Sequence, residues 1–111
     1  MQTLKNRSEY TQALMPDGTI ILEGTTTSCP NCKAIAPFLS KLQQKYPDAR
    51  WYEYNVDEAE DIAQELGVRV VPSFTVFKDG MLVDGVTGAG RGNENKLEGV
   101  IKECYEGVVV D

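Results

Sequence analysis

The sequence of 111 residues contains no histidine and only three cysteines. A closed structural zinc site normally takes four ligands from Cys and His side chains. Cys29 and Cys32 have the spacing of half a zinc site, but the chain is short of the ligands that would complete it. Three cysteines are also too few for the disulfide framework of a small secreted protein. The sequence therefore predicts no metal site and favours a protein of a reducing compartment.

Basic residues and long apolar runs are also scarce. Lys and Arg together number 11 against 17 Asp and Glu, which gives a formal net charge of −6. Nucleic-acid phosphates and anionic membranes repel such an acidic chain. No apolar stretch approaches the length of a transmembrane helix, and residues 1–7 lack the apolar run of a secretory signal. We therefore expect one domain over residues 1–111, a cytoplasmic location, and neither a nucleic-acid nor a membrane partner.

The two nearby cysteines stand at the junction of two patterns. Residues 19–25 form a β-branched and nearly continuous apolar run, which is typical of a central strand buried on both faces. Residues 30–46 carry apolar side chains at helical spacing. Cys29 is therefore expected at the entrance of a helix, with Cys32 one turn later on the same side, which suits a disulfide. Free N–H groups of the first turn stabilise a thiolate there, and Pro30 suits the first helical position. These features predict that Cys29 attacks a disulfide and that Cys32 resolves the mixed disulfide.

The rest of the chain alternates helical and extended patterns. Asp79-Gly80 is a hairpin turn signal, Asp57 with Glu60 forms a capping-box pattern, and residues 88–92 are a glycine-rich break. The expected elements are a helix over 8–14, a strand over 19–25, a helix over 30–46 kinked at Pro37, a strand over 51–56, a helix from Asp57 to Gly67, hairpin strands over 74–77 and 81–86, and a helix from about 95 to 106. This order predicts an α/β fold with a central mixed sheet of four to five strands and helices on both faces.

Several segments together resemble the thioredoxin family. Residues 32–38 are similar to the segment after that family's active site, including its helix proline. Asn55-Val56-Asp57 resembles a strand end, Val71-Pro72-Ser73-Phe74 resembles the cis-proline loop, and Gly88-Ala89 resembles the close of the last strand. The resemblance covers essentially the whole chain. It implies a thioredoxin fold and a monomeric protein-disulfide reductase that cycles Cys29 and Cys32 between dithiol and disulfide without a cofactor. The implied partners are disulfide-containing proteins and a thioredoxin reductase, or glutathione.

The resemblance also assigns roles around the two cysteines. It implies that Val71-Pro72 is a cis peptide opposite the cysteines, that backbone groups of Val71 bind an extended substrate strand, and that Pro72 shields the thiols. Without the resemblance, Pro72 would be interpreted as a simple proline at the start of a strand. The complete set of implied substrate-binding residues is Ser28, Pro30, Val71, Pro72 and Gly88.

An acidic residue takes the third implied catalytic role. Glu23 lies six residues before Cys29, where the family has a buried acid that helps to deprotonate the resolving thiol. A carboxyl group buried on a central strand has a raised pKa and can accept the proton of Cys32 directly or through water. The alternative is an acid at a strand end that is turned to solvent.

The sequence departs from the family pattern at several positions. Ser28-Cys29-Pro30-Asn31-Cys32 replaces the usual Trp-Cys-Gly-Pro-Cys, and we hypothesise that the changed dipeptide makes the pair more oxidising than the about −270 mV of thioredoxin. Glu53 occupies a position where the family often has a lysine. If Glu53 and Glu23 lie close together, one of the two carboxyl groups should have a raised pKa. The glycine-rich segment from Gly90 to Asn93 is expected to be a flexible loop, and Cys104 is expected to pack as a small hydrophobic residue.

Other functions compatible with these patterns remain open. Ser28 in place of the family's tryptophan and Glu53 in place of its lysine would suit a binding or adaptor module on the same scaffold, with little redox activity. A glutathione-dependent, glutaredoxin-like oxidoreductase is a further alternative, although Val70-Val71-Pro72 in place of Thr-Val-Pro favours thioredoxin. An iron–sulfur carrier that uses Cys29 has weaker support.

Overall fold

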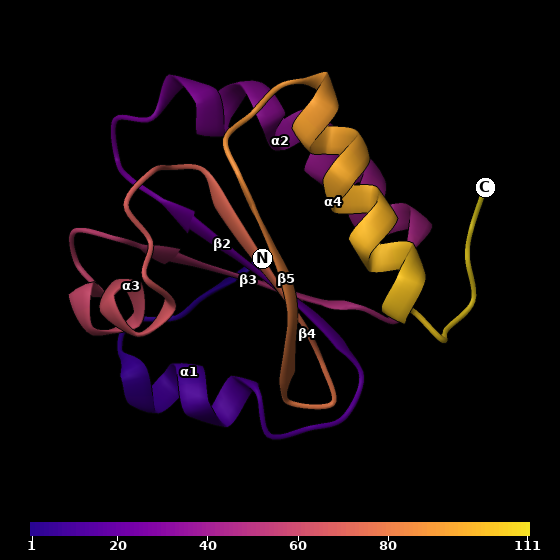
Figure 1. Cartoon of the computed structure of the whole chain (residues 1–111), viewed down its shortest axis with the longest axis horizontal. Helices are drawn as coiled ribbons and strands as arrows, with labels where there is room; N and C mark the ends of the chain where they lie inside the picture. The colour runs from indigo at the N-terminus through magenta and orange to yellow at the C-terminus, as the bar shows by residue number, and fades with distance from the viewer.

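The computed structural model describes all residues from Met1 to Asp111 and contains five strands and four helices. Figure 1 shows how they are arranged. In chain order the elements are β1 (Gln2–Thr3), α1 (Arg7–Ala13), β2 (Thr19–Thr25), α2 (Pro30–Lys45), β3 (Arg50–Asn55), α3 (Glu60–Leu66), β4 (Ser73–Lys78), β5 (Met81–Thr87) and α4 (Arg91–Cys104). None of the helices combines the length and the apolar composition that crossing a membrane requires.

The five strands form one mixed sheet in the order β1-β3-β2-β4-β5. β3 pairs in parallel with both β1 and β2, whereas β4 is antiparallel to both β2 and β5. β2 is therefore the central strand, and six of its seven residues are buried. This confirms both the predicted mixed sheet and the interpretation of the continuous apolar run, because a strand with neighbours on both edges and helices on both faces has no side in contact with water.

Helices cover the sheet on both faces (Figure 1). α2 and α4 lie on one face, where their apolar side chains pack with Ile21 of β2 in a cluster of 13 buried residues. α1 and α3 lie on the other face, where Ile20 and Leu22 of the same strand join a cluster of 8 buried residues. Successive strand residues point to opposite faces. The alternation of β2 therefore divides the core into two layers, with the cysteine-bearing helix on the α2 face.

The turn at Asp79-Gly80 forms a hairpin as predicted. Asp79 has a φ of 51° and Gly80 a φ of 80°, and positive values at both central residues are the requirement of the tight hairpin turn that matches strand twist. The carboxylate of Asp79 also accepts a hydrogen bond from the N–H of Gly18 at 2.8 Å. The hairpin is thereby connected to the residue that precedes β2.

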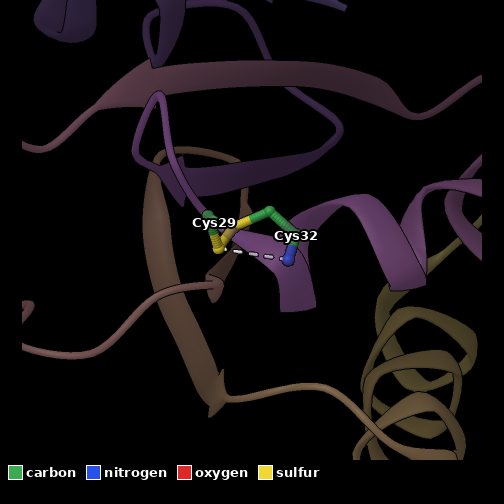
Figure 2. The surroundings of a disulfide bond; sticks show 2 residues. All are labelled: Cys29 and Cys32. Atoms are coloured by element: carbon green, nitrogen blue, oxygen red, sulfur yellow. Dashed lines mark hydrogen bonds between the residues drawn. A yellow bond between two sulfur atoms is a disulfide. The ribbon is translucent and has the colours of Figure 1, made fainter.

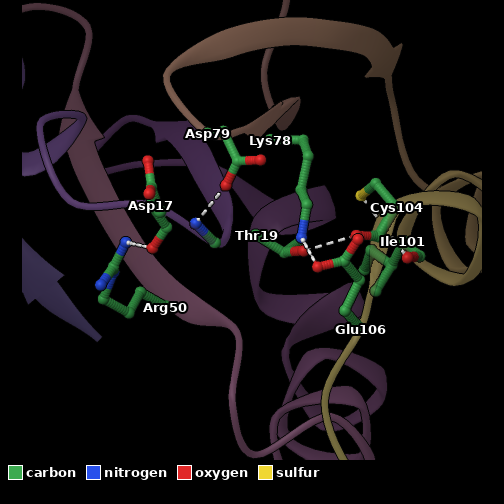
Figure 3. Close-up of polar contacts among 9 residues, drawn as sticks. Asp17, Thr19, Arg50, Lys78, Asp79, Ile101, Cys104 and Glu106 are labelled. Atoms are coloured by element: carbon green, nitrogen blue, oxygen red, sulfur yellow. Dashed lines mark hydrogen bonds and ion pairs between the residues drawn. The ribbon is translucent and has the colours of Figure 1, made fainter.

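The start of β2 is held by polar contacts at the end of the sheet away from Cys29 (Figure 3). The Thr19 hydroxyl donates to the carbonyl of Cys104 at 3.1 Å, and Arg50 donates to the carbonyl of Asp17 at 2.7 Å. Cys104 packs against the α2-side core and its thiol lies 3.5 Å from the Ile101 carbonyl. These contacts fix the start of β2 relative to α4 and β3. The position of the other end of the strand, which leads to Cys29, is thereby defined as well.

Two predicted helix starts are wrong. Asp57 does not cap α3, because the helix begins at Glu60 with Ala59 at the N-cap and no side-chain cap bond. The reason is Asn55, whose side-chain oxygen accepts the N–H groups of Asp57 and Glu58 at 2.9 and 3.2 Å and forms a turn before the helix.

The second correction concerns the glycine-rich segment from Gly90 to Asn93. It is not a loop as expected, because α4 begins at Arg91 rather than near residue 95. The N–H of Glu94 donates to the carbonyl of Gly90 at 2.8 Å and closes the first turn of the helix. Gly90 stays outside the helix as its N-cap, with a φ of 108° that favours glycine.

Candidate active site

The cysteine pair lies at the start of α2, directly after the loop that follows β2 (Figure 2). β2 ends at Thr25 and α2 begins at Pro30, which places Cys29 at the N-cap with extended backbone and Pro30 at the first helical position. The sulfur of Cys29 accepts a hydrogen bond from the backbone N–H of Cys32 at 3.1 Å. Free N–H groups of a first helical turn carry partial positive charge and stabilise an anion that they face. The predicted placement of Cys29 at the helix entrance is confirmed.

The two sulfurs are joined in a disulfide. The Cα atoms of Cys29 and Cys32 are 5.2 Å apart, within the usual range of about 4.4–6.8 Å. Cys29 is 5% exposed, whereas Cys32 is half-buried. Accessibility in the oxidised state therefore does not mark Cys29 as the attacking thiol. Its distinguishing feature is the N-cap position.

The Val71-Pro72 peptide is cis, as the resemblance implied. Pro72 is buried and directly precedes Ser73, which pairs with Gly24 near the end of β2 that leads to the cysteines. The N–H of Gly88 donates to the carbonyl of Pro72 at 2.7 Å. Strand pairing thus brings Pro72 and Gly88 side by side and places both at the end of the sheet that carries Cys29.

The other two residues expected at the substrate surface flank Cys29 directly. Ser28 and Pro30 are both exposed, and Val71 is half-buried. The loop before the cysteines is connected to β3, because the Asn55 amide donates to the Thr27 hydroxyl at 3.3 Å. Sequence reasoning did not find this contact, although Asn55 belonged to a segment that resembled the family.

An open cavity of about 420 Å³ lies behind the cysteines, between α2 and the sheet. Its lining includes both cysteines, Glu23 and Glu53, and Lys33 of α2. No group of three or more His, Cys, Asp or Glu side chains in the structure is arranged to hold a metal ion. The cavity therefore presents two carboxylates to the disulfide from the side of the sheet.

Glu23 is a buried acid on the central strand, with 4% of its surface exposed. Burial raises its pKa from the ordinary 4.5 to about 7, and the charge of Glu53 adds to this rise. The cause is that a low-polarity surrounding and a neighbouring negative charge both disfavour the ionised carboxylate. The alternative of an acid turned to solvent is wrong. A group with such a pKa can take up or release a proton near neutral pH.

Glu53 lies directly beside Glu23, because the two residues are paired in the parallel register of β2 and β3. Glu53 is half-buried, and its carboxylate accepts a hydrogen bond from the hydroxyl of Thr3 at 3.4 Å. Thr3 is in turn the register partner of Glu53 on β1. Sequence reasoning missed Thr3, since nothing in a two-residue edge strand indicates which strand it will join.

These features define a thiol–disulfide oxidoreductase, since a disulfide at a helix N-terminus is accompanied by a buried acid of raised pKa. The comparisons with known proteins agree. Residues 2–103 match the family model described as Thioredoxin. Thioredoxin AMT13 of Alternaria alternata is 43% identical over 90 residues, which cover 80% of this chain and 76% of that protein.

Solved structures give the same result. The oxidised crystal structure of mitochondrial thioredoxin 3 from Saccharomyces cerevisiae has a TM-score of 0.86 and 35% identity, covering 93% of this chain and 94% of that one. A structure on thiol resolution in yeast mitochondrial 1-Cys peroxiredoxin through the glutathione and thioredoxin systems has a TM-score of 0.86 and 34% identity, covering the same shares of the two chains. The chain therefore belongs to the thioredoxin family and has the thioredoxin fold. It is a thiol–disulfide oxidoreductase of the protein-disulfide reductase type, with Cys29 and Cys32 as its redox pair.

Proposed function

We propose that this protein reduces protein disulfides by attack of Cys29 and resolution by Cys32. The observation that carries the assignment is the N-cap position of Cys29, whose sulfur already accepts the N–H of Cys32 at 3.1 Å. An N-terminal helix site lowers the pKa of a thiol and favours the thiolate, which is the attacking species. Cys32 lies inside the first turn and is the closest sulfur to Cys29, so it is placed to attack an adduct formed there.

The reaction balances in two exchanges. The Cys29 thiolate attacks one sulfur of the substrate disulfide and forms a mixed disulfide, while the second substrate sulfur leaves as a thiolate and takes a proton from water. Cys32 then loses its proton and attacks the sulfur of Cys29. The bond to the substrate breaks and the substrate leaves as a dithiol. The two electrons it has gained come from the Cys29 and Cys32 thiols, which are oxidised to the Cys29–Cys32 disulfide.

Glu23 is proposed as the group that accepts the proton of Cys32. Both residues line the cavity behind the disulfide, and burial raises the pKa of Glu23 to about 7. A base with a pKa near the working pH is ionised often enough to act and basic enough to take a proton. The transfer runs directly or through a water molecule in the cavity.

The substrate surface is proposed to consist of Ser28, Pro30, Val71, Pro72 and Gly88. The exposure of the two residues beside Cys29, and the strand pairing that brings Pro72 and Gly88 to the same end of the sheet, support this assignment. The half-buried Val71 forms the cis peptide with Pro72, and its backbone groups are proposed to pair with an extended chain. We expect a target disulfide to lie across this surface with its backbone along Val71.

The active-site sequence Cys29-Pro30-Asn31-Cys32 is atypical, and we propose that it makes the pair more oxidising than about −270 mV. A redox titration in graded thiol buffers, with alkylation read by mass spectrometry, measures this potential. A value at or below that of thioredoxin would contradict the proposal without affecting the assignment of the two cysteines.

The partners are proposed to be disulfide-containing proteins and a thioredoxin reductase, with glutathione as the alternative reductant. One similar structure concerns thiol resolution in a yeast mitochondrial 1-Cys peroxiredoxin, so peroxiredoxins are a substrate class to test here. We propose a monomer whose residues 1–111 form a single domain and that works in the cytoplasm, although one similar structure is a mitochondrial thioredoxin. Insulin reduction, coupled separately to a reductase with NADPH and to glutathione, distinguishes the two reductants.

An adaptor module that uses the same fold without redox turnover is the second candidate, and a trapping experiment separates the two. Cys32→Ser and Cys29→Ser are compared, each combined with Cys104→Ser to remove the third thiol. We expect Cys32→Ser to accumulate mixed disulfides with many proteins and Cys29→Ser to accumulate few. The opposite result would assign the attack to the more exposed Cys32. Capture of no protein by either variant would support the adaptor.

A further inference from the structure

A row of three polar side chains crosses the sheet behind the disulfide. Thr3 of β1 pairs in register with Glu53 of β3, and Glu53 pairs in register with Glu23 of β2. Register partners on neighbouring strands point to the same face of a sheet and lie about 5 Å apart. Both carboxylates also line the cavity of about 420 Å³ that contains the two cysteines. The resolving thiol therefore faces a pair of acids rather than a single one.

The two acids have unequal surroundings. Glu23 is 4% exposed, whereas Glu53 is half-buried and accepts the Thr3 hydroxyl bond at 3.4 Å. Water and a hydrogen-bond donor both favour an ionised carboxylate, and burial disfavours it. Of the two carboxylates, Glu23 is therefore the one whose ionised form the surroundings disfavour more.

The other charged groups around the cavity do not cancel this repulsion. Lys33 of α2 and Met1 with its amino group also line the cavity, and neither forms an ion pair with a carboxylate there. The remaining titratable groups of the lining are Cys29 and Cys32, which do not titrate while they form the disulfide. The negative charge of Glu53 is therefore left to act on Glu23.

We propose that Glu53 is a positioning residue that sets the pH at which Glu23 accepts the proton of Cys32. Its negative charge makes the ionised form of Glu23 less favourable, so that Glu23 is a stronger base than burial alone would make it. The proton released when Cys32 attacks Cys29 then moves onto Glu23. This inference rests on the proposed role of Glu23 and adds Glu53 as the residue that adjusts it.

The first test is a titration of the oxidised protein, in which the cysteines are silent. Carbon-13 NMR of the glutamate carboxyl carbons follows Glu23 in the unmodified chain, in Glu53→Gln and in Glu53→Lys. We expect Glu53→Gln to lower the midpoint of Glu23 by about one pH unit, a tenfold loss of proton affinity, and Glu53→Lys to lower it further. Burial, the larger cause of the raised pKa, remains, so the midpoint should stay above 4.5.

Glu103→Gln is the matched control, because it removes the same charge from an exposed position on α4. The proposal is overturned if Glu53→Gln and Glu53→Lys move the Glu23 midpoint no more than Glu103→Gln does. Because a neutral and a positively charged variant are both used, the failure of one to fold leaves the other decisive. A purely structural role of Glu53 would change stability without moving this midpoint.

The second test follows the chemistry through the pH profile of a single turnover of the reduced protein with excess protein disulfide. Glu23→Gln identifies how much of the acid limb, the fall in rate toward low pH, depends on Glu23. We expect Glu53→Gln to move that part to lower pH by the same amount as in the NMR titration. If the NMR midpoint moves and the limb does not, the proposal fails. If Glu23→Gln also leaves the limb unchanged, the proposed proton acceptor fails with it, so the two failures are distinguished.

Discussion

Replacing Glu23 by Gln should stabilise the protein at high pH and leave its stability nearly unchanged at low pH. Burial first, and the charge of Glu53 second, raise the pKa of Glu23 from 4.5 to about 7. Between these two values the folded state binds a proton that the unfolded state has released. The free energy of unfolding therefore falls as the pH rises through this window, because ionised Glu23 disfavours the folded state. Gln resembles the protonated acid in shape and does not ionise, so the variant lacks this loss.

The magnitude follows from the same two pKa values. One pKa unit corresponds to about 1.4 kcal/mol of difference between the two protonation states. The rise from 4.5 to about 7 thus predicts a loss of about 3 kcal/mol across the window, complete above the higher pKa. Because Glu23 is only 4% exposed, solvent screening reduces this figure little. A cost of this size is a large part of the stability of a small domain.

Urea unfolding of the oxidised proteins measures the effect, since the intact disulfide keeps the cysteines from titrating. Trp51 is the only tryptophan and is 8% exposed, so its fluorescence reports on unfolding of the core around it. We expect Glu23→Gln to match the unmodified chain at about pH 4 and to exceed it by about 3 kcal/mol at about pH 8. Exposed Glu103→Gln is the control and should show no such dependence. An equal difference at both pH values would refute the raised pKa of Glu23.

Other predictions concern the core and the third cysteine. Tyr46 and Tyr54 are both 0% exposed, but only the Tyr46 hydroxyl has a partner, the Glu98 carboxylate at 2.9 Å. Tyr46→Phe should therefore cost about 1–2 kcal/mol in urea unfolding and Tyr54→Phe about zero, and equal losses would contradict this reasoning. Gly24→Ala should cost about 1–3 kcal/mol, because its Cβ would lie 2.9 Å from the Tyr54 hydroxyl oxygen; an unchanged unfolding midpoint would show that the ring moves away freely. Cys104→Ala should leave insulin reduction unchanged, since Cys104 packs against the core, and a loss of turnover would indicate a regulatory thiol.

Features that depend on neighbours along the chain could be predicted well. The apolar spacing of residues 30–46 corresponds to α2, which runs from Pro30 to Lys45, because burial of one helix face imposes a period near 3.6 residues. The turn at Asp79-Gly80 formed where its residue types allow positive φ. Glu23 was found because its distance from Cys29 along the chain resembled that in a family. Each of these signals lies within one element or one short segment.

Features that depend on competition between local structures were harder to predict. Asp57 has the residue type of a helix cap. Its backbone N–H instead donates to the side-chain oxygen of Asn55 in a turn, and the helix begins later, at Glu60. The glycines around Arg91 disfavour a helix, yet α4 starts there, and Leu97, Val100 and Ile101 bury their side chains against the sheet. Propensities near 1 kcal/mol per residue are smaller than what this burial contributes.

By itself, the sequence determined the order of the elements from α1 onward, the central place of β2, the CxxC pair at a helix entrance and the membership of a redox family. These features follow from periodicity, turn chemistry and residue spacing within short segments. Only the tertiary structure decided which side chains meet across strands, as Thr3, Glu53 and Glu23 do, and which of the two cysteines is the more buried. The physical reason is that strand register sets the distance between residues far apart in sequence. A pKa depends on that distance and on burial, and neither can be read from the chain alone.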